Sequence, residues 1–361
     1  MLPFDSRRAG RRIAFVIMAL VVFGSLVGCK KLFGRRGPRG YDAGTYATAG
    51  TATTAFGMAG GVDAGGAGTG GAEADTAYKK ALALNEAACL SGTMTKCNDL
   101  GINYEEGQGT PVDYLKAGDY YKKACDGKIP DGCANLGALY DDGKGFPTDK
   151  VKASSFYQTA CDGGSNRGCN HLGLHYLYAQ GGRKQDNAKA VALFTKACDK
   201  SDAYACTNLG YMYWKGLGVR VDFAKCVDLY ERGCSGGDPN GCGNLGIQQE
   251  KGEGTVKDEF TASLSYKKGC DGGALGACVN LGALYEDGRG VTLSGKKAAD
   301  YYEKGCTGGR ASGCTNLARL YEKGIGVPVD QTKAKGFYKK ACDNGDASAC
   351  TSYAALSKRG F

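Results

Sequence analysis

Sixteen of the eighteen cysteines in this 361-residue chain form eight pairs of identical spacing, C-x7-C, and the pairs recur about every 36 residues. The pairs are Cys89/Cys97, Cys125/Cys133, Cys161/Cys169, Cys198/Cys206, Cys234/Cys242, Cys270/Cys278, Cys306/Cys314 and Cys342/Cys350. A fixed period of this length is typical of a solenoid, in which each repeat buries its apolar face against its neighbours. We therefore expect residues 76–361 to form one repeat array.

Within each repeat, apolar and aromatic residues follow helical spacing. Two residues after the second cysteine comes an asparagine such as Asn135, and five residues later a tyrosine such as Tyr140. A G-x-G turn follows, and the next segment carries a buried-type alanine and aromatic such as Ala153 and Tyr157. This pattern predicts two antiparallel helices per repeat, with the glycines ending the first helix. The predicted fold class is all-α.

The recurring motif N-L-G-x-x-Y-x-x-G-x-G-V followed by K-A-x-x-x-Y-x-K-A-C resembles the Sel-like repeat family, which is related to the tetratricopeptide repeats. Its C-x7-C form resembles the secreted, cysteine-rich proteins of the Hcp type. The resemblance covers residues 76–361. It implies a right-handed α/α superhelical solenoid of about eight 36-residue hairpins, used to scaffold or adapt other proteins. It also implies a rival activity, since Hcp-type proteins are often classed as β-lactamases or penicillin-binding proteins.

The N-terminus resembles a bacterial lipoprotein signal peptide over residues 1–28. Four arginines precede an apolar run, Ile13–Leu26, that is shorter than a membrane-spanning helix requires. The run ends at Gly28-Cys29, which predicts lipid on Cys29 and attachment to a membrane. Lys30 favours sorting to the outer membrane, on its periplasmic face or at the cell surface. An uncleaved signal anchor or a plain secretory signal are the alternatives. Residues 29–75 are rich in Gly, Ala and Thr and are expected to be a disordered tether.

Export to an oxidising compartment favours disulfides at the paired cysteines. Each cysteine could pair across its C-x7-C loop or within its own hairpin. Pairing within hairpins would leave Cys89 and Cys350 without partners, because the array opens with a second-type helix and closes with a first-type helix. We therefore predict eight local disulfides that staple the solenoid. The competing reading is a set of thiolate metal sites. Cys226 stands outside the pairs, in the alanine position, and is expected to be a small buried residue.

The unit between Cys169 and Cys198 departs most from the repeat pattern, with one extra residue in its turn. It carries the two histidines of the chain, His171 and His175, four residues apart on one predicted helix. Such a pair can share a metal ion, but no third ligand is evident, so no metal site and no cofactor are predicted.

Another departure concerns the position eight residues after the second cysteine, which is mostly acidic. It is Leu177 and Trp214 in two adjacent units, and Tyr178 lies beside them. An acidic row would thus be interrupted by an apolar, aromatic patch, and aromatic residues are enriched in protein interfaces. We predict that Leu177, Tyr178 and Trp214 contribute to a partner-binding site. Repacking around the insertion is the alternative explanation.

The leading functional hypothesis is a lipid-anchored scaffold of the cell envelope that binds a protein or peptide. The formal charge of +9 does not indicate nucleic-acid binding, because acidic residues are interspersed with the basic ones along the repeats and no basic patch is predicted in them. For the rival hydrolase, Ser265-x-x-Lys268 and Ser294-x-x-Lys297 fit the S-x-x-K motif, but the S-D-N and K-T-G motifs are absent. No catalytic residues are therefore predicted, and enzyme activity stays open. A peptidoglycan- or glycan-binding module is a third possibility.

Overall fold

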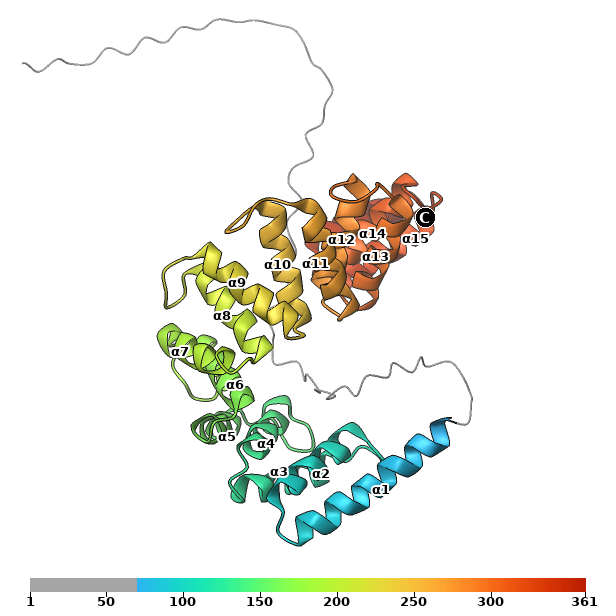
Figure 1. Cartoon of the computed structure of the whole chain (residues 1–361). Helices are drawn as coiled ribbons and strands as arrows, with labels where there is room; N and C mark the ends of the chain where they lie inside the picture. Colours follow the sequence, from blue (N-terminus) through green and yellow to red (C-terminus); the bar gives the residue numbers. More distant parts are fainter. Residues whose placement is uncertain (1–69) are drawn as a thin grey trace, which may run out of the picture. The chain divides into compact units, whose positions relative to one another are not determined.

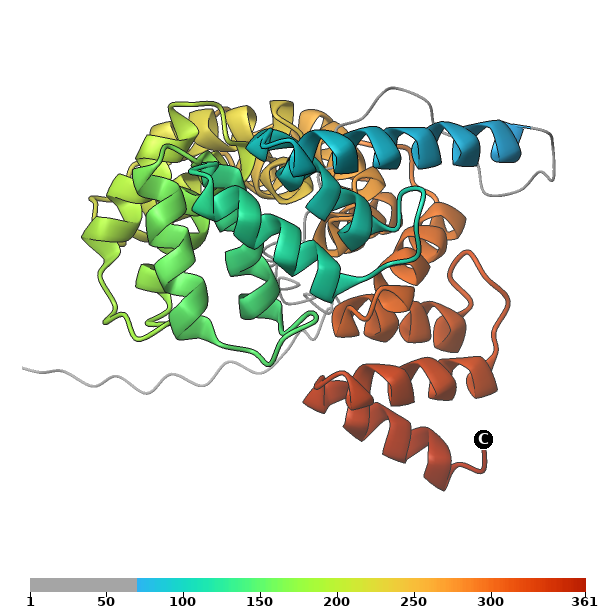
Figure 2. The same ribbon diagram turned by 90° about the horizontal axis from the view of Figure 1, so that it is seen from below.

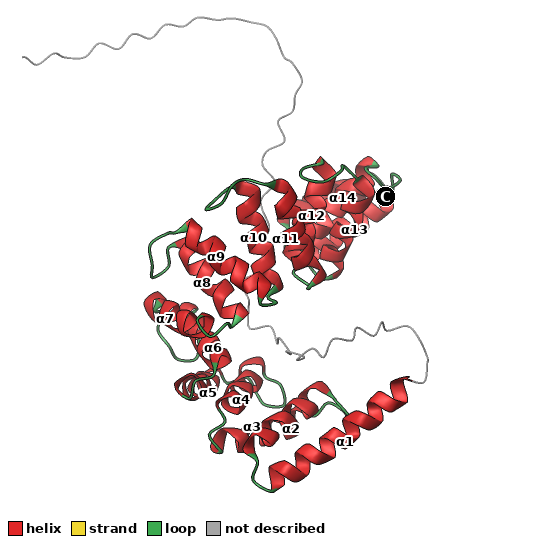
Figure 3. Ribbon diagram, viewed as in Figure 1, coloured by secondary structure: helices red, strands yellow, loops and turns green. Residues whose placement is uncertain are grey.

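The computed structural model describes residues 70–361, with side chains from Thr76 onward (Figure 1). Within this range all regular secondary structure is helical (Figure 3). The helices are α1 (Gly70–Leu90), α2 (Met94–Glu106), α3 (Tyr114–Asp126), α4 (Pro130–Asp142), α5 (Lys150–Asp162), α6 (Asn166–Leu177), α7 (Asn187–Cys198), α8 (Ala203–Lys215), α9 (Phe223–Ser235), α10 (Pro239–Lys251), α11 (Glu259–Asp271), α12 (Leu275–Asp287), α13 (Gly295–Thr307), α14 (Ala311–Lys323), α15 (Gln331–Asp343) and α16 (Ala347–Lys358). Cys29, the predicted signal peptide and most of the predicted tether lie outside the described residues. None of the described helices is long and apolar enough to cross a membrane.

The predicted all-α solenoid is confirmed. Each even-numbered helix from α2 to α14 forms a hairpin with the helix that follows it, and we call these the first and second helices of a repeat. Each helix packs mainly on its neighbours in the chain, as Figures 1 and 2 show. Helix α1 is a second helix that precedes the first hairpin, and α16 is a first helix that follows the last one.

The helix boundaries follow from capping residues. The seven second helices from α3 to α15 begin after a side chain that accepts a hydrogen bond from a backbone N–H of the first turn. These caps are Asp113, Asp149, Asp186, Asp222, Asp258, Ser294 and Asp330. Most first helices end at a glycine in the left-handed conformation, such as Gly143 with φ 70°. Helix α6 differs, because its last turn is followed by Tyr178 and by Ala179 at φ 53°.

The two helices of a hairpin approach closely where a glycine of the first helix faces an aromatic ring of the second. In the hairpin of α12 and α13, a Cβ atom placed on Gly282 would lie 2.8 Å from Cδ1 of Tyr302, which is fully buried. Such a contact is too short for any side chain, so only glycine allows this packing. The same glycine–tyrosine contact recurs at Gly137 and Tyr157.

All sixteen paired cysteines form the predicted disulfides across their own C-x7-C loops. The eight bonds join Cys89–Cys97, Cys125–Cys133, Cys161–Cys169, Cys198–Cys206, Cys234–Cys242, Cys270–Cys278, Cys306–Cys314 and Cys342–Cys350. Each bond ties the end of a second helix to the start of the next first helix, and therefore braces a junction between repeats. The thiol of Cys226 is free and fully buried, and burial raises its pKa to about 12. A neutral, inaccessible thiol fits the predicted packing role.

We expect mild reduction to open the Cys342–Cys350 bond before the others. It is the one disulfide of the eight in which neither cysteine is fully buried, and its helix α16 packs mainly on α15. Terminal elements also open most readily by fraying. Limited reduction at neutral pH, followed by alkylation and peptide mass spectrometry, should label Cys342 and Cys350 first. Equal labelling of all eight pairs would show that the ends of the array are no less stable than its centre.

Candidate functional site

The acidic positions near the ends of the first helices do not form an open stripe. They point into the hairpins, where each glutamate accepts a hydrogen bond from the tyrosine of the second helix 16 residues later. The pairs are Tyr121–Glu105 at 2.6 Å, Tyr266–Glu250 at 2.7 Å, Tyr302–Glu286 at 2.9 Å and Tyr338–Glu322 at 2.9 Å. The side chains of Glu250 and Glu286 are buried. This row therefore holds the hairpins together and is not a surface for a partner.

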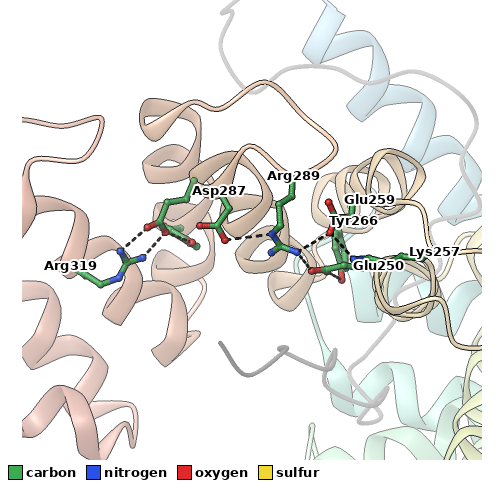
Figure 4. Close-up of polar contacts among 9 residues, drawn as sticks. Glu250, Lys257, Glu259, Tyr266, Asp287, Arg289 and Arg319 are labelled. Carbon is green, nitrogen blue, oxygen red and sulfur yellow. Dashed lines mark hydrogen bonds and ion pairs between the residues drawn. The ribbon is translucent and has the colours of Figure 1, made fainter. Parts of the chain in front are cut away.

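Arginines of the following repeat complete two of these pairs, as Figure 4 shows. Arg319 on α14 donates to both carboxylate oxygens of Glu286, at 2.7 and 2.5 Å. Arg289, in the turn after α12, donates to Glu250 at 2.5 Å and lies 3.7 Å from Glu259. A buried carboxylate is stable only when it is paired and hydrogen-bonded. Each arginine thus both neutralises the carboxylate and links two consecutive repeats.

Leu177 interrupts the acidic row without creating a surface. Its side chain is 4% exposed and packs in the same core cluster as Phe194, which occupies the tyrosine position of that repeat. This repeat therefore lacks both the carboxylate of the acidic row, replaced by Leu177, and the tyrosine hydroxyl that binds it in other repeats, replaced by Phe194. The space between the two helices is apolar here. The prediction that Leu177 contacts a partner is therefore wrong, because a core side chain offers no area for binding.

Trp214 interrupts the same row in the next repeat, but remains partly exposed at the end of α8. One side of the indole packs against the core cluster that contains Cys226, Val227 and Tyr230. The ring centroid of Tyr211 lies 6.1 Å from that of Trp214. The ammonium of Lys215 lies 4.0 Å from the centroid of the Trp214 ring, and that of Lys251 lies 5.9 Å from it. We call Tyr211, Trp214, Lys215 and Lys251 the Trp214 patch.

The charge of the neighbouring surface changes at this point of the array. We consider the residue that directly follows each position of the acidic row. In α2 and α4 this residue is acidic, Glu106 after Glu105 and Asp142 after Asp141. The equivalent residues in the next three repeats are Tyr178, Lys215 and Lys251. Tyr178 caps the end of α6 and is 44% exposed. The side chains at this position thus change from acidic to aromatic and basic, and the ammonium of Lys251 also lies 3.9 Å from Glu253.

Both histidines contact the ring of Tyr157. The His171 ring stacks on it with centroids 4.7 Å apart, and the His175 ring meets it edge-on at 5.3 Å. Nε2 of His175 is 3.3 Å from Oδ1 of Asp141, which also accepts a hydrogen bond from Lys150 at 2.8 Å. In residues 76–361 no three His, Cys, Asp or Glu side chains converge as metal ligands. The contacts of both histidines are those of packed core residues.

In neither S-x-x-K motif does the serine hydroxyl bond to the ammonium group of the lysine. The hydroxyl of Ser265 donates to Gln249 Oε1 at 2.7 Å, and the hydroxyl of Ser294 caps α13 by accepting from the backbone N–H of Lys297. The ammonium of Lys297 lies over the ring of Tyr285. A serine nucleophile needs a base within hydrogen-bond reach, and the structure places no base beside either hydroxyl.

Arg289 and Arg319 were not predicted from the sequence, because their roles depend on contacts between residues that are more than 30 positions apart, in consecutive repeats. A signal for the tyrosine–carboxylate pairs was nevertheless present. The constant separation of 16 residues, and the joint change to Leu177 and Phe194, would have indicated that the acidic side chains point toward the second helix.

Comparisons with known proteins agree with this architecture. The model of the Sel1 repeat matches residues 97–128, 130–165, 166–202, 203–238, 276–309 and 311–346. A search of curated proteins finds no match.

Two solved structures show the same fold over most of the chain. The protein c5321 of uropathogenic Escherichia coli, described as a protective antigen with an SLR fold, is 29% identical, with a TM-score of 0.58. The match covers 78% of this chain and 60% of that protein, so this chain spans less than two thirds of its length. A Sel1 repeat protein of Oxalobacter formigenes is 25% identical over 78% of this chain and 81% of its own, with a TM-score of 0.58.

Repeats built in this way usually serve as scaffolds for protein–protein interaction, and the six matched segments cover more than half of the sequence. This chain belongs to the Sel1 repeat family.

Proposed function

We propose that this protein is an exported interaction scaffold of the cell envelope, anchored by lipid on Cys29, that binds a protein partner through the Trp214 patch and Tyr178. The observation that carries the proposal is the position of Trp214. It replaces a buried carboxylate of the acidic row, yet it remains partly exposed beside Tyr211 and two ammonium groups. Partly exposed aromatic side chains next to cations are the residues that interfaces favour.

Eight disulfides support the exported location, because such bonds persist in oxidising compartments. The lipid anchor rests on the Gly28-Cys29 sequence. We expect the full-length protein, produced in a lipoprotein-processing bacterium, to partition into the detergent phase of Triton X-114, because an acyl chain adds about 0.8 kcal/mol per buried CH₂. The Cys29→Ser variant should partition into the aqueous phase. Detergent partitioning that is unchanged in this variant would exclude lipid on Cys29.

The binding site is tested by substitution of Trp214. In crosslinked pull-downs from the cells that produce the protein, Trp214→Ala should lower the recovery of at least one specific partner by about fivefold, since truncation of a central aromatic residue typically costs more than 1 kcal/mol. Val329→Ala is the matched control, because Val329 is an apolar side chain that is 61% exposed in another repeat. If every partner is recovered equally with Trp214→Ala and with the wild type, the patch is not the binding site.

A further inference from the structure

The hairpin of α10 and α11 lacks a side-chain stack that the other six hairpins share. Elsewhere a tyrosine of the first helix lies beneath a lysine of the second, with the ammonium 4.5–5.3 Å from the ring centroid. In four hairpins an aromatic ring also stacks on that tyrosine, as Tyr301 does on Tyr285 at 5.6 Å. The hairpin of α10 and α11 has Gln249, Thr261 and Ser265 at these three positions, and Ser265 donates a hydrogen bond to Gln249.

The same hairpin exposes three large apolar side chains in a row. Val256 in the turn is 84% exposed, and Phe260 and Leu264 on α11 are 59% and 53% exposed. Phe260 and Leu264 are spaced four residues apart on α11 and therefore lie along one face of it, and Val256 lies in the turn just before the helix. No other hairpin has a large apolar residue at all three positions, and the Leu264 position elsewhere holds Asp, Ser, Ala or Gly. We call Val256, Phe260 and Leu264 the α11 ridge.

The family comparison identifies the same hairpin independently. The Sel1 model matches the repeats on both sides of it but leaves residues 239–275 unmatched. The hairpin is nevertheless folded like the others, with both caps, its disulfide and the tyrosine–glutamate bond in place. The hairpin departs in its core at Gln248, which is buried where most other repeats have leucine or methionine, and on its surface at the α11 ridge. Exposed apolar side chains that gather on one surface are the pattern of a binding surface.

A cation extends the ridge by one further helical turn. Lys268 follows Leu264 by four residues, is exposed, and has no carboxylate within ion-pair distance in the described part of the chain. The two nearest lysines in sequence differ, because Lys267 is paired with Asp271 and Lys257 with Glu259. An apolar row that ends in an unpaired ammonium is complementary to an apolar segment with a carboxylate at one end.

We propose that the α11 ridge and Lys268 dock an amphipathic helix of a partner protein, with apolar residues at i and i+4 and an Asp or Glu one turn further on. A second copy of this chain is the other possible occupant, and the test below distinguishes it. The surface uses no residue of the Trp214 patch, so its success or failure is independent of the function proposed above.

The test uses the full-length protein and a phage-displayed library of random 16-residue peptides. Panning against the wild type, with counter-selection on Phe260→Ala/Leu264→Ala, should enrich peptides with the stated apolar and acidic spacing. Fluorescence anisotropy of an enriched peptide should show at least tenfold weaker binding to the double variant and to Lys268→Glu. Replacing the acidic residue of the peptide by lysine should restore binding to Lys268→Glu. Leu115→Ala/Val151→Ala is the matched control, with two exposed apolar side chains on other second helices, and should bind normally.

Three results would overturn the proposal. The first is the absence of enrichment above the counter-selection. The second is unchanged affinity of an enriched peptide for the double variant, with circular dichroism showing that both proteins are folded. The third is a wild-type dimer in light scattering that Phe260→Ala/Leu264→Ala converts to a monomer, since this would identify a second copy as the occupant.

Discussion

Replacing Glu286 by alanine is expected to destabilise the C-terminal repeats by about 3–5 kcal/mol, the cost of breaking a buried ion pair by removing one partner. Glu286 accepts hydrogen bonds from Tyr302 of its own hairpin and from Arg319 of the next repeat. Without the carboxylate, the buried hydroxyl of Tyr302 and the largely buried guanidinium of Arg319 would each lose this hydrogen bond. Hydrogen exchange of the amides of α12–α14 measures this loss, because repeats open locally.

The chain itself suggests the control. At Leu177 and Phe194 the carboxylate and the tyrosine hydroxyl are both absent, and the site is filled by apolar atoms. The triple variant Glu286→Leu/Tyr302→Phe/Arg319→Met should therefore regain most of the stability that Glu286→Ala loses, since apolar replacement of a whole buried ion pair is often neutral. Glu303→Ala, on the exposed face of α13, should change little. If Glu286→Ala were as stable as Glu303→Ala, the polar row would not hold the repeats together.

Acidification is expected to destabilise the centre of the array through His171. Burial, together with the positive charge of Arg167, lowers the pKa of His171 to about 3. The unfolded chain binds a proton near pH 6.5, so between about pH 6.5 and pH 3 it holds more protons than the folded chain, and stability falls as the pH falls. The side chain is partly exposed, although Nδ1 is buried, so we expect a loss of roughly 1–2 kcal/mol between pH 7.5 and pH 5.

Urea unfolding at pH 7.5 and pH 5 measures this loss, and His171→Asn should remove most of it. Asparagine is the natural residue at this position in five other repeats, including Asn135. Asp141 contributes in a different range. Although burial raises its pKa, the neighbouring His175 and the bond from Lys150 bring it down to about 2. Its contribution is present above about pH 4 and is lost only as the pH falls toward 2. An equal loss at pH 5 in His171→Asn and in the wild type would contradict the assignment.

The regular part of the structure could be predicted because every repeat has the same spacing of cysteines, glycines and apolar residues. Helix hairpins, glycine caps and local disulfides follow from spacing within 36 residues, and one period is enough to deduce them. The cysteine pairing was predicted from the order of the helix types. Only pairing across each C-x7-C loop gives a partner to both Cys89, on α1, and Cys350, on α16.

The candidate site was harder to predict because the direction of a side chain decides its role. Leu177 and Trp214 occupy equivalent positions, yet one is in the core and the other is partly exposed. The difference depends on what fills the space next to them: Phe194 accompanies Leu177, while Trp214 lies beside the lysines of two repeats. The departures in α10 and α11 were overlooked for another reason, because Phe260 and Leu264 look like ordinary apolar helix positions until their exposure is known.

We propose that a partner binds where the acidic row gives way to the Trp214 patch. Photocrosslinking in the producing cells tests it most directly, with p-benzoylphenylalanine placed at Lys215 and, in a separate protein, at the equivalent Asp287 two repeats later. We expect a discrete covalent adduct with a partner at position 215 and none at position 287. Adducts of equal yield at both positions, or an adduct at 287 alone, would contradict it.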